Sequence, residues 1–214
     1  MSLASTTLPA WQASLVRSLN YGGTQRQRKR TDANRKHVQI ATVDGATGRP
    51  SVRTVVFRGW LPNRFLPGFT EAQTSPDPKG ESCSLMFVTD KRSAKYEHIA
   101  AGAGAPVECC WWLSEAGVQY RIAGEASVSA SGTAAADFAW ERLSDGAKRT
   151  FSWPNPGEAV GGTAAGEREE EGRSNFVLLT VNPSSVDELH LGGSQKRILH
   201  EVKEGAWQEA FVNP

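Results

Sequence analysis

Short apolar runs separated by turns limit the folds open to this chain. Four such runs follow one another near the C-terminus, at residues 176–181, 186–191, 196–202 and 207–212, with proline, glycine or serine between them. Short strands at this spacing, interrupted by only a few helices, are typical of antiparallel barrels and not of alternating strand–helix units. We therefore predict a mainly β protein, built as an antiparallel barrel with a few flanking helices.

Length and composition favour a single domain. The chain has 214 residues, of which 39% are hydrophobic, and this supplies enough apolar material for one sizeable core. We expect one domain over residues 1–214, with helices near 11–19, 94–101 and 134–143. The segment 157–174 is rich in glycine, alanine and glutamate, and this composition predicts a mobile loop.

Charge and cysteine usage argue against several kinds of partner. A net charge of +1 gives no case for nucleic acid, and no apolar run approaches the length of a membrane-spanning helix. Cys83, Cys109 and Cys110 lack metal-ligand spacing, and the four histidines are scattered. We expect no metal site, no nucleic-acid partner and no membrane partner.

The N-terminal segment has two interpretations. Its first 31 residues contain no Asp or Glu and are rich in Ser and Thr, as organellar transit peptides are. The spacing of Trp11, Leu15 and Leu19 instead predicts a helix that packs on the domain, which leaves little room for a removable leader. The basic cluster 26–36 is typical of a solvated linker, with a nuclear address or a phosphate patch as alternatives. We expect a cytoplasmic protein, with a plastid or a mitochondrion as the alternative location.

The run from Arg53 to Arg58 combines strong strand formers with a guanidinium at each end. It follows the alternating run His37–Val43 after a turn that contains glycine and proline, so the two runs predict a β-hairpin. Side-chain alternation would place the two arginines on opposite faces of a flat strand, about 16 Å apart at roughly 3.3 Å per residue. Two solvated arginines are the simpler interpretation of this strand taken alone. A twist, a bulge or a long ligand would be needed for both to serve one site.

Further polar residues indicate where such a ligand would bind. Thr89, Ser93 and Lys95 surround the start of a predicted helix, where hydroxyls, an ammonium and free backbone N–H groups suit a phosphate. Arg53 would close that site from the neighbouring strand. The amide of Gln119 can both donate and accept hydrogen bonds, which suits the edge of a flavin ring.

The order of these residues resembles the pyridoxamine 5′-phosphate oxidase family of FMN-binding split barrels. Arg53–Arg58 is similar to the family's Arg-x-Val-Leu-Leu-Lys strand. Phe87–Lys95 is similar to its Phe-Tyr-Thr-Asn-x-x-Ser-Arg-Lys turn, and Val118–Gly124 to its Arg-Gln-Val-Arg-Ile-x-Gly strand. The resemblance is closest over residues 34–128. It implies a six-stranded type of antiparallel split barrel, a homodimer with FMN sites at its interface, and a small-molecule substrate.

The resemblance also implies roles for individual residues. Polar residues of the first two segments would hold the FMN phosphate and ribityl chain, and Gln119 would reach the same flavin from the partner subunit. Arg58 and Arg142 would contact the substrate, while Ser152 and Trp153 would belong to a segment that closes over the cofactor. The implied cofactor contacts are Arg53, Thr54, Val55, Val56, Arg58, Val88, Thr89, Ser93, Ala94, Lys95, Gln119, Ser152 and Trp153.

Several positions depart from the family pattern and bear on the choice of reaction. Arg58 replaces a lysine, Ala94 a phosphate-binding arginine, and Phe138 a tyrosine. Residues 188–192 and 196–200 keep only the frame of the family's Glu-Phe-Trp-Gln-Gly and Arg-Leu-His-Asp-Arg motifs, without its substrate-binding Arg-x-His. The pattern resembles a divergent branch of the family found in photosynthetic organisms.

We therefore predict an FMN-dependent oxidoreductase that resembles pyridoxamine/pyridoxine 5′-phosphate oxidase. In the oxidase version its substrate is a vitamin B6 phosphate. An FMN-dependent reductase of another small molecule is one alternative, because the substrate motif is altered. A non-catalytic flavin- or haem-binding split barrel is another, since a fold does not determine chemistry and His190 and His200 would be available to haem. The sequence requires no side-chain general base, so no catalytic residue is assigned.

Overall fold

The computed structural model describes residues 8–22, 34–67, 80–102, 104–160 and 169–214. In these ranges the chain forms one nine-stranded sheet in which every strand pair is antiparallel. The mainly antiparallel β architecture predicted from the sequence is therefore confirmed. The strands are β1 His37–Val43, β2 Pro50–Val56, β3 Gly59–Pro62, β4 Glu81–Asp90, β5 Ala105–Leu113, β6 Val118–Ala130, β7 Phe176–His190, β8 Lys196–Lys203 and β9 Ala206–Val212.

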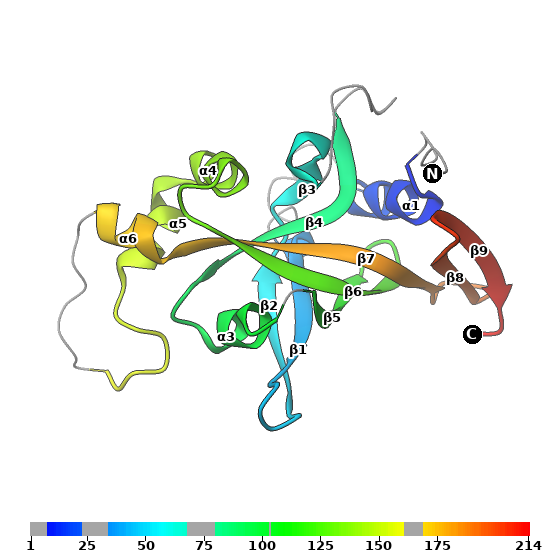
Figure 1. Ribbon diagram of the computed structural model, residues 1–214. Helices are drawn as coiled ribbons and strands as arrows, with labels where there is room; N and C mark the ends of the chain where they lie inside the picture. The colour runs from blue at the N-terminus through cyan, green and yellow to red at the C-terminus, as the bar shows by residue number, and fades with distance from the viewer. Residues whose placement is uncertain (1–7, 23–33, 68–79, 103, 161–168) are drawn as a thin grey trace.

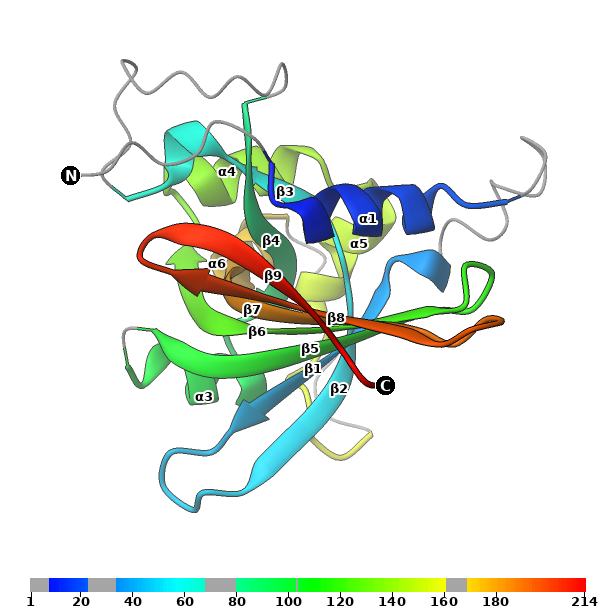
Figure 2. The ribbon, with the colours of Figure 1, turned by 90° about the vertical axis from the view of Figure 1, so that its right-hand side faces the viewer.

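Helices flank this sheet at its two ends. Figure 1 shows α4, α5 and α6 grouped at one end of β6 and β7, with α1 and the β8–β9 hairpin at the other end. The helix α3 packs beside β1, β5 and β6 in both views (Figures 1 and 2). The helical segments are α1 Ala10–Leu19, α3 Ala94–Ala100, α4 Ala134–Glu141, α5 Asp145–Arg149 and α6 Glu169–Asn175, with 3₁₀ turns η1 Asn63–Phe65 and η2 Thr150–Ser152.

The strand order brings distant segments together. Hydrogen bonding arranges the strands as β2-β1-β5-β6-β7-β4-β3, and β8 adds to β7 and β9 to β8. The hairpin predicted from His37–Val43 and the following run is confirmed, with Ile40 opposite Arg53. Since α3 follows β4 and packs beside β1, the start of α3 lies near the hairpin that carries Arg53.

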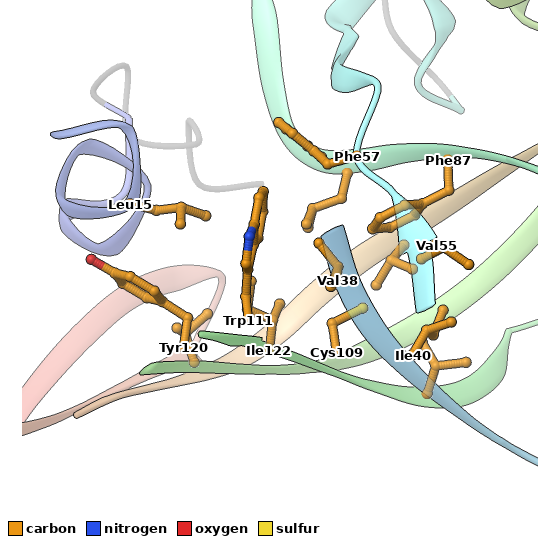
Figure 3. Close-up of a cluster of buried hydrophobic side chains, with 14 of the residues drawn as sticks. Leu15, Val38, Ile40, Val55, Phe57, Phe87, Cys109, Trp111, Tyr120 and Ile122 are labelled. Carbon is orange, nitrogen blue, oxygen red and sulfur yellow. The ribbon is translucent and has the colours of Figure 1, made fainter. Parts of the chain in front are cut away.

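The larger core lies between α1 and the inner face of the sheet. Trp11 and Leu15 are four residues apart, so they share one face of α1, and both are fully buried. Figure 3 shows Leu15 pointing from α1 toward the ring of Trp111. The helix predicted near residues 11–19 is therefore part of the domain. Other members of this core are Val38, Ile40, Val55, Phe57, Phe87, Cys109, Tyr120 and Ile122.

A second, smaller core lies under α4 and η2. The rings of Trp140, Phe151 and Phe176 pack edge to face or tilted, with centroids 5.0 to 5.9 Å apart. Leu61 and Met86 belong to the same cluster. This core fixes the 3₁₀ turn η2, and therefore the segment that contains Ser152 and Trp153, against β7.

The C-terminal half contains one long strand where the sequence predicted two. The sequence predicted strands at 176–181 and 186–191 with a turn at 183–185, but β7 runs unbroken from Phe176 to His190. The register between β6 and β7 shifts at Ala123 and Gly124, where Gly124 lies opposite Pro183. Because a bulge tolerates a residue that cannot donate a ladder hydrogen bond, the strand continues through the proline.

Gly124→Ala should destabilise the protein at this bulge. A Cβ added to Gly124 would overlap the carbonyl oxygen of Asn182 and the Cα of Pro183, and backbone atoms cannot rotate away. We expect a loss of about 1–3 kcal/mol in the free energy of unfolding, measured by urea denaturation. Gly146→Ala is the control, because a Cβ there meets no atom closer than 3.9 Å. Equal stability of the two variants would contradict the clash.

Two surface expectations differ from the structure. Within the basic cluster 26–36, Arg35 is buried rather than solvated, because its guanidinium donates to the carbonyl of Leu19 at 2.9 Å and lies 3.6 Å from Glu115. Residues 26–33 lie outside the described ranges. Residues 169–174 of the predicted loop 157–174 form most of α6, since glutamate and arginine are good helix formers. Residues 161–168 lie outside the described ranges.

Candidate functional site

Arg53 lies in β2 with its guanidinium turned toward β1. Its Nη1 donates to Thr42 Oγ1 at 2.7 Å and to the carbonyl of Ser51 at 2.9 Å, and its Nη2 donates to Ser51 Oγ at 2.8 Å. The side chain is half-buried, and this burial lowers the pKa of the guanidinium from its ordinary value. These contacts hold the arginine in a fixed orientation rather than leaving it solvated.

The turn between β4 and α3 gathers two hydroxyls and an ammonium. Thr89 Oγ1 and Ser93 Oγ lie 3.0 Å apart, and both residues are buried. Lys95 Nζ donates to Thr89 Oγ1 at 3.0 Å. The Ser93 hydroxyl donates to the carbonyl of Asp90 at 2.8 Å, which closes the turn. The residues predicted to act together at this turn are therefore in contact.

Arg53 and Lys95 form a pair of cations at this place. Burial, and then the positive charge of Arg53, lower the pKa of the Lys95 ammonium, while Asp90 acts in the opposite direction. Among the described residues, no carboxylate oxygen lies within 4.0 Å of either cation. Two partly desolvated cations held beside hydroxyl groups suit a dianion such as a phosphate.

Arg58, at the other end of the Arg53–Arg58 run, lies outside the strand that carries Arg53. The strand ends at Val56, and Arg58 is exposed beyond it, with its backbone N–H donating to the carbonyl of Met86 at 2.8 Å. On β2 itself, Val55 is buried, Val56 is half-buried and Thr54 is exposed on the other face. No hydrogen bond or ion pair joins Arg53 to Arg58 in the described part of the chain. Because Arg58 lies outside β2, the prediction that the two arginines occupy opposite faces of one strand stays a prediction.

Gln119 lies on the opposite face of the sheet from Arg53. Its neighbours in β6, Val118 and Tyr120, are buried on the inner face, so Gln119 points to the outer face and is half-buried there. On that outer face Arg121 pairs with Asp187, which also accepts from Arg197. A single copy of the chain therefore does not bring Gln119 to Arg53.

Two guanidiniums stack on Phe138 of α4. The Arg142 guanidinium carbon lies 3.7 Å from the ring centroid of Phe138, and that of Arg64 lies 5.0 Å from it. Arg64 also stacks on Phe65 at 4.5 Å. Sequence reasoning singled out Arg142 and Phe138 but missed Arg64, because its approach to α4 depends on the course of the chain after β3.

The remaining predicted contacts lie around the turn and η2. Val88 is half-buried in β4, and Ala94 is exposed at the start of α3. Ser152 ends η2, where a Cβ on Gly172 of α6 would meet its hydroxyl oxygen. Trp153 is 61% exposed, which is unusual for so large an apolar side chain.

Sequence reasoning also missed the residues that orient Arg53. Thr42 is a buried polar residue on the inner face of β1, and its Oγ1 lies 2.9 Å from Nδ1 of His98 as well as accepting from Arg53. A threonine at an inward-facing position of an apolar strand was the available signal. His98 gave none, because its place beside Thr42 depends on how α3 packs on β1.

Comparison with known proteins decides the family. A family model described as pyridoxamine 5′-phosphate oxidase, FMN-binding domain, matches residues 8–130. The chain belongs to this family. The family supports an FMN-dependent oxidoreductase, and FMN is its cofactor, in agreement with the sequence prediction. The paired cations Arg53 and Lys95 fit the phosphate of that cofactor.

Relatives of the pyridoxamine 5′-phosphate oxidase family extend the match over most of the chain. Pyridoxine/pyridoxamine 5′-phosphate oxidase 2 of Arabidopsis thaliana is 28% identical over 193 residues, which cover 83% of this chain and 87% of that protein. A pyridoxamine 5′-phosphate oxidase-related, FMN binding protein from Nostoc punctiforme is 30% identical, with a TM-score of 0.73 and coverage of 97% of this chain and 100% of that chain. The split-barrel fold class is therefore confirmed.

A more distant solved structure shares the fold alone. The structure of PhzG from Burkholderia lata, in complex with tetrahydrophenazine-1-carboxylic acid, is 14% identical, with a TM-score of 0.64 and full coverage of both chains.

Among the described residues of this chain, no helix is long and apolar enough to cross a membrane. The same residues contain no group of three or more His, Cys, Asp or Glu side chains suited to a metal ion.

Proposed function

We propose that this chain is an FMN-dependent oxidoreductase whose cofactor phosphate binds between Arg53 and the turn that contains Thr89, Ser93 and Lys95. The single observation that carries the proposal is the Arg53–Lys95 pair, which is partly buried and lacks a carboxylate partner among the described residues. Holding two like charges together is unfavourable unless an anion joins them. A phosphate would supply that anion and accept hydrogen bonds from both cations.

The protein's part in the reaction is to bind and orient. FMN, when bound, supplies the redox chemistry by accepting two electrons from the substrate. Arg53 and Lys95 would anchor one end of the cofactor, and the backbone of Val55 and Val56 would lie along its ring. Arg58, exposed at the far end of the run, would add positive charge near that ring and favour the reduced, anionic state of the cofactor.

The site is proposed to be completed by a second copy of the chain. Gln119 lies on the outer face of the sheet, away from Arg53, so it would reach the flavin of the partner subunit. The outer face and its edges expose large apolar side chains, with Val52 65% and Trp112 45% exposed. Such a surface is suited to an interface. A homodimer with FMN sites at its interface accounts for both observations.

The substrate is proposed to be a small molecule with an anionic group. Arg142 is held on the face of Phe138, and Arg64 approaches the same ring, so two guanidiniums would meet an anionic group there. In the pyridoxamine 5′-phosphate oxidase version, this anionic group is the phosphate of a vitamin B6 phosphate. That substrate is oxidised, and oxygen is reduced to peroxide.

One observation favours the alternative, a reductase of another small molecule. Near the C-terminus, Arg197 is paired with Asp187 at 2.9 Å, and His200 is buried with its Nε2 at 3.2 Å from Glu188. Glu188 also lies 2.7 Å from His190. These side chains are engaged within the fold, which leaves no Arg-x-His arrangement for the B6 ring and also engages both histidines of the haem alternative.

Purified protein tests the proposal in two steps. The proposed function requires a yellow protein, or a colourless one that takes up added FMN and then shows a flavin spectrum. A peroxide assay with pyridoxamine 5′-phosphate and pyridoxine 5′-phosphate then separates the oxidase from the reductase. A preparation that refuses FMN would overturn the proposed function, and a haem Soret band without flavin would favour the non-catalytic alternative.

FMN affinity should depend on pH because both the FMN phosphate and the Lys95 ammonium change charge with pH. The FMN phosphate becomes a dianion above its second pKa, about 6, so affinity should rise from pH 5 to 7. The pKa of Lys95 is lowered from 10.5, so on the alkaline side affinity should fall as the ammonium loses its proton below that value. Titration of FMN fluorescence from pH 5 to 10 measures both limbs. Riboflavin, which lacks the phosphate, is the control, and a parallel change in its affinity would contradict the assignment.

A further inference from the structure

The side chain of Arg92 joins the turn that contains Thr89 and Ser93, the phosphate turn, to the segment Phe151–Asn155. Arg92 lies in the turn between Thr89 and Ser93, and its Nη1 donates to Asn155 Oδ1 at 3.0 Å. Its Nη2 donates to the carbonyl of Phe151 at 3.1 Å. A single guanidinium therefore contacts two residues of a segment that lies far along the chain.

The guanidinium is oriented by its own turn. Arg92 Nε lies 2.9 Å from Asp90 Oδ1 and Nη2 lies 2.7 Å from Asp90 Oδ2, which is a bidentate pair. The backbone N–H of Arg92 also donates to Asp90 Oδ1 at 2.8 Å. Because the guanidinium is planar, two bonds along one edge direct its remaining donors toward the segment. A lysine in this position could not reproduce that geometry.

The segment is fixed at one end by the core. The ring of Phe151 packs between Trp140 and Phe176, and its carbonyl also accepts from Asn175 Nδ2 at 3.1 Å. Asn155 lies four residues farther on and is exposed, so its hydrogen bond to Arg92 holds the outer end of the segment. Trp153, 61% exposed, lies between these two attachments.

We propose that Arg92 is a positioning residue that couples FMN binding to the placement of Ser152 and Trp153. The inference rests on the proposed function, which places the FMN phosphate at the turn of Thr89 and Ser93, and on the family resemblance, which implies that Ser152 and Trp153 belong to a segment over the cofactor. A phosphate that orders the turn also orders Arg92, and the oriented guanidinium holds the segment. By linkage, the held segment strengthens binding of the cofactor to the same extent that the bound cofactor stabilises the held segment, and tighter binding is expected to appear as slower release.

The experiment compares Arg92→Leu, Arg92→Lys and Asn155→Ala with the wild type. FMN release is followed by the recovery of its fluorescence after dilution, and hydrogen exchange is followed by mass spectrometry over residues 148–158. We expect FMN release to be about tenfold faster in R92L, because this variant loses both hydrogen bonds from the guanidinium to the segment and about 1.4 kcal/mol is a tenfold change. N155A, which keeps the Asp90 pair, should show a smaller increase of about threefold, and R92K should lie between wild type and R92L.

Arg173→Leu is the matched control. Arg173 of α6 pairs with Asp137 at 2.9 Å, so R173L removes an arginine–aspartate pair from the same part of the molecule without touching the phosphate turn. Its FMN release should match the wild type. In R92L without FMN, exchange over 150–156 should be faster than in the wild type, and added FMN should slow exchange there only when Arg92 is present.

The outcomes separate this inference from the proposed function. Wild-type protein that binds no FMN would overturn the proposed function, while exchange in the cofactor-free variants would still report whether Arg92 holds the segment. Wild-type protein that binds FMN, with R92L and N155A releasing it at the wild-type rate, would overturn only the coupling. Faster exchange in R92L with unchanged release would show that Arg92 is structural and would also overturn the coupling.

Discussion

Arg53→Ala is expected to weaken FMN binding by about a hundredfold or more. The guanidinium is already oriented by Thr42 and Ser51, so it would meet a phosphate without reorganising. Each charge-assisted hydrogen bond contributes about 1.5–3 kcal/mol, and about 1.4 kcal/mol is a tenfold change in the dissociation constant. Removal of the side chain deletes at least one such bond and leaves Lys95 as the only cation of the pair. Fluorescence titration of the cofactor-free protein with FMN measures the change.

Two controls assign the effect to the phosphate. Riboflavin has the same ring without the phosphate, so its affinity should be similar in the wild type and R53A. Arg49→Ala removes an exposed arginine from the turn of the same hairpin, and it should bind FMN like the wild type. An R53A variant with unchanged FMN affinity, or one that loses riboflavin as strongly as FMN, would show that Arg53 does not bind the phosphate.

Local patterns predicted the parts of the site that lie close together in sequence. Thr89, Ser93 and Lys95 fall within one turn, so a motif places them together without knowledge of the fold. The face of β6 on which Gln119 lies also follows from local sequence, because it depends only on the two-residue period of a strand.

The contacts between segments could not be predicted in this way. The expectation that Arg53 closes the site of Lys95 came from what a phosphate requires, whereas the approach itself depends on how α3 packs beside the β1–β2 hairpin. The unbroken course of β7 through Pro183 depends on Gly124, in another strand, and a proline in sequence alone predicts a turn. The contact of Arg92 with Asn155 likewise depends on the second core, which fixes Phe151 beside the turn.

Trp111→Ala is expected to cause the largest loss of stability. Trp111 is fully buried in β5, its ring centroid lies 4.9 Å from that of Phe57, and its Nε1 donates to the carbonyl of Arg35 at 2.7 Å. Truncation of a buried tryptophan costs about 3–5 kcal/mol, through lost burial and the cavity left behind. Since a domain is typically stable by about 5–15 kcal/mol, this is a large share of the total. Urea denaturation followed by circular dichroism measures the loss.

Trp112→Ala is the matched control, and it also tests the proposed dimer. Trp112 is the next residue of β5, so it points to the outer face, where it is 45% exposed. In a monomer its loss should cost less than about 1 kcal/mol. If a second copy covers the outer face, the cost of W112A should grow as the protein concentration is raised, because dimerisation then contributes to stability. The cost of W111A should not depend on concentration, because that ring is buried within one chain. Equal costs for the two variants at every concentration would contradict the inner and outer faces assigned to β5.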